Sequence, residues 1–116
     1  MEAYGLNFSP DLGYPTTATG FGETNDWTKA TLSHNTVVVN GAKQYKLVQQ
    51  HGYPKHFDDS GIVKLFDVDS PIAYSTAPIY RRTLLMIKVD DEISYGVDFF
   101  RVKGGNKHTY SFHTQS

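Results

Sequence analysis

The second half of the chain reads as a series of short β-strands separated by turn residues, and this pattern limits the fold more than any other feature. The segments 61–68, 72–76, 79–89, 92–102 and 108–114 are rich in β-branched, aromatic and aliphatic residues. Asp90-Asp91 and Gly104-Gly105-Asn106 separate the last three segments. Such residues tolerate a positive φ, so they predict hairpin turns, and strands joined by short turns are antiparallel.

The first half of the chain is more irregular. Residues 2–8 and 33–39 predict two strands, the second of which is ended by Asn40-Gly41. Residues 9–31 lack periodicity and predict one long ordered loop, and residues 45–60 predict a second irregular segment. No segment longer than a turn has a helical period. The predicted fold class is therefore all-β, as an antiparallel β-sandwich or a piece of one.

Composition and missing motifs exclude several classes of function. The 11 basic and 12 acidic residues give a net charge of −1, so the chain has no overall attraction for nucleic acid or an anionic membrane. The longest apolar run, residues 84–87, is too short to span a bilayer. The sequence contains no phosphate-binding glycine loop, no serine nucleophile elbow and no HExxH motif. We therefore expect no nucleic-acid or membrane partner.

His34 is the histidine whose neighbours restrict it most. Ser33 and Asn35 can hydrogen-bond to the backbone around it, and the β-branched run 37–39 follows. Asp11 lies near the start of the long loop that precedes His34, and a carboxylate and an imidazole could converge on a cation such as Zn²⁺. The alternatives are a structural histidine at a strand entrance and a turn aspartate.

The other four histidines lie in two pairs. His51 and His56 fall in an irregular segment, with no pattern that would direct both rings at one ion. His108 and His113 fall on opposite faces of one strand, because strand side chains alternate, so they cannot share a ligand. One of these two can reach a substrate groove, and a place on the sheet surface is the alternative.

Arg81-Arg82 places one guanidinium on each face of a strand. A bidentate clamp on a substrate carboxylate or sulfate is natural chemistry for such an arginine. The alternative is an exposed arginine beside an inward one that pairs with Asp67 or Asp98.

The order of these motifs resembles the heparinase II/III group of polysaccharide lyases, with the alginate lyases close by. The resemblance covers nearly the whole chain, and its most specific part is the D-x-G motif at residues 11–13 followed by S-H-N-T-V-V-V-N-G-x-x-Q at residues 33–44. The segments YRRTLLMIKVDD, YGVDFFRVKGG and HTYSFH are typical but less diagnostic. The resemblance implies an α-helical toroid followed by stacked antiparallel sheets. Residues 1–116 would then be a single partial β-sandwich domain, part of a larger stacked-sheet domain, without the toroid.

The resemblance also implies a function. Such enzymes cleave uronic-acid-containing polysaccharides, such as heparin, heparan sulfate or alginate, by β-elimination, and they are periplasmic or secreted. Their zinc ion is held by an upstream H-x-H-x-D motif, the Asp of D-x-G and the His of H-N-T. Asp11 and His34 match the last two, and the first ligand is expected upstream of residue 2. The catalytic residues are expected outside these 116 residues, so the chain alone is expected to be inactive.

The partner implied by the resemblance is an acidic polysaccharide, and Arg81 and His113 are the residues that we expect to contact it. A non-catalytic carbohydrate-binding or structural β-sandwich module is the alternative, from a different functional class. Residues 2–8 and 108–114 are expected to form open sheet edges, which favour self-association.

Overall fold

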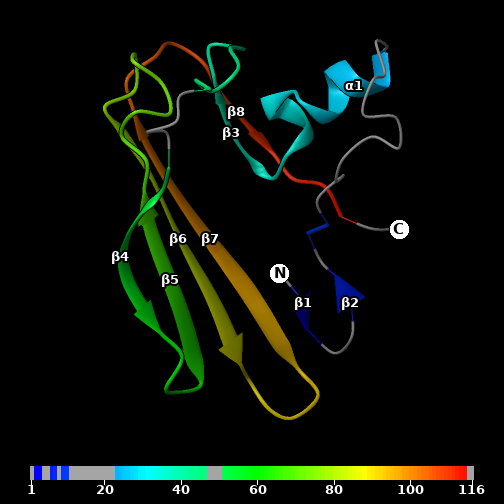
Figure 1. The fold of residues 1–116 in the computed structure, drawn as a ribbon. Helices are drawn as coiled ribbons and strands as arrows, with labels where there is room; N and C mark the ends of the chain where they lie inside the picture. Colours follow the sequence, from blue (N-terminus) through cyan, green and yellow to red (C-terminus); the bar gives the residue numbers. More distant parts are fainter. Residues whose placement is uncertain (1, 4–5, 8, 11–22, 47–50, 115–116) are drawn as a thin grey trace. The chain divides into compact units, whose positions relative to one another are not determined.

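A computed structural model of the chain describes residues 2–3, 6–7, 9–10, 23–46 and 51–114 (Figure 1). The elements of the first 44 residues are the strands β1 (Glu2–Ala3) and β2 (Leu6–Asn7), the helix α1 (Glu23–Thr28), the 3₁₀ helix η1 (Thr31–Ser33) and the strand β3 (Thr36–Val39). The remaining strands are β4 (Tyr53–Asp58), β5 (Val63–Asp69), β6 (Ile79–Lys88), β7 (Ser94–Lys103) and β8 (His108–Ser111). All pairings among them are antiparallel, which confirms the all-β class.

The chain divides into two compact units. The first unit joins Met1–Gln44 to Asn106–Ser116, and the second unit is the continuous segment Tyr45–Gly105. No helix in the described ranges is long and apolar enough to cross a membrane.

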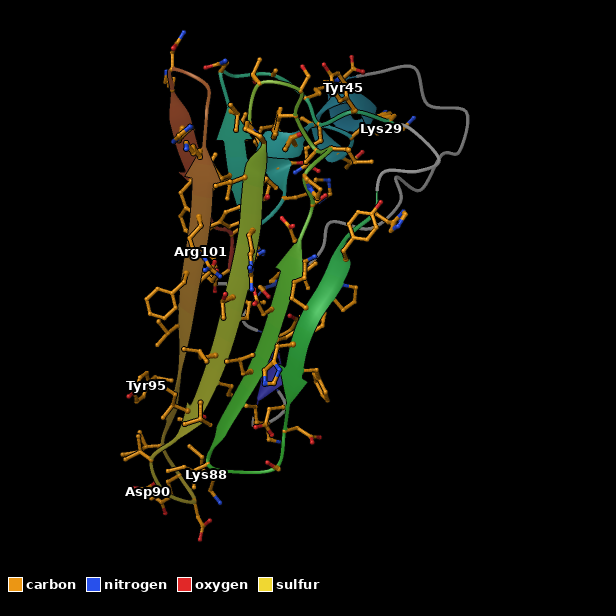
Figure 2. The ribbon with its side chains drawn as sticks, turned by 90° about the vertical axis from the view of Figure 1, so that its left-hand side faces the viewer. Lys29, Tyr45, Lys88, Asp90, Tyr95 and Arg101 are labelled. Carbon is orange, nitrogen blue, oxygen red and sulfur yellow. The ribbon has the colours of Figure 1, made fainter. Side chains whose placement is uncertain are left out.

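The second unit is a four-stranded sheet with the order β4-β5-β6-β7. The strands β5, β6 and β7 follow the predicted segments closely. The hairpin predicted at Asp90 is confirmed: its carboxylate accepts hydrogen bonds from the backbone N–H groups of Glu92 and Ile93. Figure 2 shows Lys88 and Asp90 at this turn and Arg101 farther along β7.

Two predictions for the second unit are wrong. Residues 53–58 form the edge strand β4, although the sequence around them looks irregular, because Pro54 and a register shift between Pro54 and His56 break the alternation. Residues 72–76 form no strand. Ala73 N–H donates to the Ser70 carbonyl, and Ala77 N–H donates to the Tyr74 carbonyl, so this apolar segment folds as turns with buried side chains.

In the first unit, β3 pairs with β8, and Val37, Val38 and Val39 are buried. The predicted end of β3 is confirmed, because Asn40 and Gly41 have positive φ angles of 55° and 68° and Ala42 N–H donates to the Val39 carbonyl at 3.0 Å. Such a turn usually makes a hairpin. Here the Asn40 side chain instead accepts from the N–H groups of Asn106 and Lys107, which lead into β8.

The hairpin predicted between residues 92–102 and 108–114 does not form, because β7 and β8 belong to different sheets. Gly104 adopts a φ of 101°, and a Cβ atom there would lie 2.1 Å from the Thr76 carbonyl oxygen. Glycine at this position therefore allows a close backbone approach as well as a positive φ.

Two further predictions differ from the structure. Residues 2–8 were expected to form one strand, but the described residues form a small hairpin in which Glu2 pairs with Asn7. The loop expected over residues 9–31 contains α1, whose six residues are too few to show a helical period. The strands β1, β2 and β8 each have one partner among the described strands, and self-association through such edges stays a prediction.

Candidate functional site

His34 lies between η1 and β3, at the strand entrance that the sequence indicates. The buried Ser33 donates its hydroxyl to the Ala30 carbonyl at 2.7 Å, and His34 N–H donates to the Thr31 carbonyl at 3.2 Å. Nε2 of His34 lies 3.1 Å from the Thr28 carbonyl oxygen. A carbonyl oxygen only accepts, so Nε2 carries a proton and donates it to Thr28.

Of the two predicted metal ligands, Asp11 and His34, the structure describes only His34. Asp11, the expected partner of His34, lies outside the described residues. Within the described ranges, no three His, Cys, Asp or Glu side chains gather as a metal site. The assignment of Asp11 and His34 as metal ligands therefore stays a prediction.

His113 follows β8, and its ring is held from one side. Its Nε2 atom lies 3.0 Å from the Leu32 carbonyl oxygen and 2.9 Å from the Ser111 hydroxyl, which itself donates to the Leu32 carbonyl at 2.7 Å. The backbone N–H of His113 donates to Oδ1 of Asn35 at 2.5 Å. The Trp27 ring lies nearly perpendicular to the imidazole, with the centroids 6.3 Å apart.

The structure thus brings the H-N-T motif and the end of β8 into one cluster, which we call the His113 site: Trp27, Leu32, Asn35, Ser111 and His113. Sequence reasoning missed Asn35, Ser111 and Trp27 as parts of it. Ser111 and His113 are two residues apart, so in the predicted strand 108–114 both lie on one face, and this spacing could have suggested that they act together. The pairing of Thr36 with Ser111, which places β8 beside the motif, has no local signal in the sequence.

Arg81 lies on β6 in a bidentate ion pair with Asp67 of β5. Nε of Arg81 donates to Asp67 Oδ1 at 2.9 Å, and Nη2 donates to Oδ2. The Thr83 hydroxyl also donates to Asp67, at 3.0 Å, and Nη2 of Arg101 lies 3.5 Å from the same carboxylate. Asp67 is buried, and the hydrogen bond from Arg81, with help from Thr83 and both guanidinium charges, lowers the pKa of its carboxyl to about 2.

Arg82 pairs on the opposite face of the sheet. It donates to both Asp98 oxygens, at 3.1 and 2.8 Å, and its guanidinium carbon lies 5.5 Å from the Phe100 ring centroid. The alternative that the sequence left open, one exposed arginine beside one paired with Asp67 or Asp98, holds only in part, because both arginines are paired. The sequence analysis did not single out Arg101. Its side chain is 54% exposed, against 35% for Arg81, so it is the more accessible of the two arginines near Asp67. Contact of Arg81 with a substrate stays a prediction.

The Asp67 cluster predicts a defined loss of stability in acid. Its pKa is about 2 in the folded chain, against an ordinary value of 3.8. Because the folded pKa is lowered, the ionised carboxylate stabilises the fold above about pH 4, and this contribution disappears as the pH falls from 3.8 toward 2. We expect Asp67→Asn to flatten the decline of stability in this window, measured by urea unfolding at a series of pH values.

The matched control is Asp91→Asn, because Asp91 pairs with Lys88 at an exposed position. Exposed pairs contribute little, so this variant should keep the wild-type slope. Equal slopes for wild type and Asp67→Asn would contradict the assignment.

The comparisons with known proteins bear on the whole chain. A family model described as "Heparinase II/III-like, C-terminal" matches residues 1–116. Neither the curated proteins nor the solved structures gave a match. The family match spans both compact units and includes the H-N-T motif, the strand that carries Arg81 and the residues around His113. The chain therefore belongs to the heparinase II/III-like C-terminal family.

Proposed function

We propose that the chain is the β-sheet part of a polysaccharide lyase that cleaves uronic-acid-containing polysaccharides by β-elimination. The family match over residues 1–116 is the observation that carries this proposal. In such a reaction a base removes the C5 proton of the uronic acid, and an acid protonates the departing glycosidic oxygen. The charge that develops on the uronate carboxylate needs preorganised donors.

In this proposal the chain supplies a wall of the substrate cleft, while the acid and base lie elsewhere in a longer protein. The exposed guanidinium of Arg101 is suited to an anionic polymer even though the net charge of the chain is −1. Periplasmic or secreted location belongs to the same proposal. Heparin, heparan sulfate and alginate are the candidate substrates.

We further propose that His34, Asp11 and a histidine upstream of this sequence bind zinc. The contact of His34 Nε2 with the Thr28 carbonyl supports a ligand role, because metal-binding histidines commonly donate their other ring N–H to such an acceptor. Nδ1 would then be the ligand atom. A bound zinc ion would contribute folding free energy to the loop and strand that hold it.

The chain alone is expected to form no unsaturated product from heparin, heparan sulfate or alginate, because its proposed role does not include the acid or the base. The measurement is the ultraviolet absorbance of unsaturated uronates, with a longer protein that contains the toroid as the positive control. Product formation by the purified chain above a heat-denatured sample would contradict the assignment of the chemistry to other residues. Failure of the longer protein on every uronate polymer would contradict the lyase.

A non-catalytic carbohydrate-binding module is the second candidate. It is favoured by Tyr110 and Phe112, two neighbouring aromatic rings that are 50% and 45% exposed and lie within 7° of parallel. Flat exposed aromatic surfaces suit the apolar faces of sugar rings. Binding of polysaccharide by the longer protein without any product would favour this candidate.

A further inference from the structure

We propose that Trp27 and His113 form a binding site for one sugar ring. In this site the indole packs against the C–H face of the sugar, and Nδ1 of His113 accepts a hydrogen bond from a sugar hydroxyl. The choice of a uronate polymer as the ligand rests on the proposed function, whereas the site itself follows from the geometry of the first unit.

Trp27 supplies the apolar wall. Its side chain is 46% exposed although it contacts the imidazole, and the backbone behind it is fixed because Ala30 N–H donates to the Trp27 carbonyl at 2.9 Å. The two rings meet edge to face at an interplanar angle of 83°, and part of the indole stays exposed beside the imidazole. In this proposal a ligand on the exposed part of the indole lies beside the imidazole and meets an aromatic surface and a ring nitrogen together.

His113 supplies the polar wall, and the structure determines which nitrogen it offers. Nε2 faces the Leu32 carbonyl oxygen, which can only accept, so Nε2 carries the proton. Nδ1 has no hydrogen-bond partner among the residues that the structure describes. When the ring is neutral, Nδ1 carries the lone pair and accepts from a hydroxyl group, whereas carboxylate and sulfate oxygens have no proton to donate to it. The site therefore selects the hydroxyl side of a sugar, and anionic groups must be bound elsewhere.

The imidazole is held in place before any ligand arrives. Ser111, which is 9% exposed, bridges Nε2 and the Leu32 carbonyl, and Asn35 accepts the backbone N–H of His113. Ser111 and Asn35 are therefore positioning residues. Preorganisation of this kind reduces the entropy lost on binding. All of these contacts lie within the first unit.

The test is titration of the 116-residue chain with three tetrasaccharides: one from heparan sulfate, one from alginate and neutral maltotetraose. Trp27 is the only tryptophan, so its fluorescence reports on the site directly, and calorimetry gives the affinities of variants without it. We expect a saturable fluorescence change with at least one acidic tetrasaccharide. Trp27→Ala should weaken that binding about tenfold or more, because buried tryptophan contacts carry much of the energy at binding sites.

Two substitutions of His113 separate its two nitrogens. His113→Gln can still donate to the Leu32 carbonyl but has no acceptor in the place of Nδ1, so binding should weaken about tenfold. His113→Asn has an amide oxygen near the place of Nδ1 and should bind more tightly than His113→Gln. His108→Gln is the matched control, because His108 lies at the other end of β8 and pairs with Val39, away from the Leu32 carbonyl.

Ser111→Ala tests the positioning role. We expect the ¹⁵N chemical shifts of His113 to report the Nε2-protonated tautomer in the wild type and a mixture in Ser111→Ala, with weaker binding, and Ser111→Thr should restore both. Unchanged tautomer and affinity in Ser111→Ala would contradict this role.

Several outcomes would overturn the site. These are wild-type affinity in Trp27→Ala or His113→Gln, equal loss in His108→Gln, or no binding of any tetrasaccharide by a chain with the circular dichroism of a folded β protein. A different result would contradict the proposed function but support this site. That result is binding that depends on Trp27 and His113, while the longer protein forms no unsaturated product.

Discussion

Replacing His34 by alanine is expected to remove zinc from the longer lyase that we propose, and to lower its melting temperature at the same time. Both effects have one cause, because the binding free energy of a structural metal is also folding free energy. The expected loss of stability is about 4 kcal/mol where free zinc exceeds its dissociation constant about 1,000-fold. Asp11→Ala should behave in the same way.

Elemental analysis and a melting curve on each purified variant are the measurements. The controls are His51→Ala and His56→Ala, because both residues lie in the second unit and we assign neither to the metal. Their zinc content should stay at the wild-type level. Full zinc occupancy and an unshifted melting temperature in both Asp11→Ala and His34→Ala would show that His34 is a structural histidine held by the Thr28 carbonyl.

Gly104→Ala is expected to destabilise the chain by about 4 kcal/mol or more, which is at the upper end for single substitutions. The new Cβ atom would lie 2.1 Å from the Thr76 carbonyl oxygen and 3.1 Å from Ala77 Cα, so the backbone must move. A φ of 101° adds a separate cost, because L-residues rarely adopt it. Urea unfolding followed by circular dichroism gives the free energy.

Gly41→Ala separates the two causes. Gly41 also has a positive φ, of 68°, but no atom lies within 4 Å of the place where its Cβ would stand. This variant should therefore lose only about 1–2 kcal/mol, the cost of the left-handed conformation. Equal losses in the two variants would mean that the approach to Thr76 contributes nothing.

The parts of the fold that the sequence predicts well are those with local causes. The strands β5, β6 and β7 show clear runs of strand-forming residues, and the Asp90 carboxylate organises the turn between two of them. The strand β4 was missed because Pro54 and the register shift obscure the pattern. The pairing of β3 with β8 was missed because Gly104 and Gly105 suggest a hairpin, and long-range pairing has no local signature.

In the candidate site, too, the sequence predicts the features with local causes and misses those that depend on long-range pairing. The place of His34 at a strand entrance follows from its neighbours, and the pairing of Arg81 with Asp67 was one of two alternatives that the sequence left open. Arg101 joins that cluster only through the cross-strand register of β6 and β7, where Arg81 lies opposite Arg101. The tautomer of His113 depends on Leu32, which comes near it only because β3 and β8 pair.

The interrupted chain path of the first unit has a consequence during synthesis. His108 comes 69 residues after its partner Val39 in the sequence, because the whole second unit lies between them. At about 5–20 residues per second, a ribosome needs about 3–14 seconds to make that stretch. The hairpins of the second unit can form within microseconds of emerging. Val37, Val38 and Val39, which are buried in the folded chain, meanwhile lack the strand that pairs with them, so a nascent chain exposes this β-branched run for seconds.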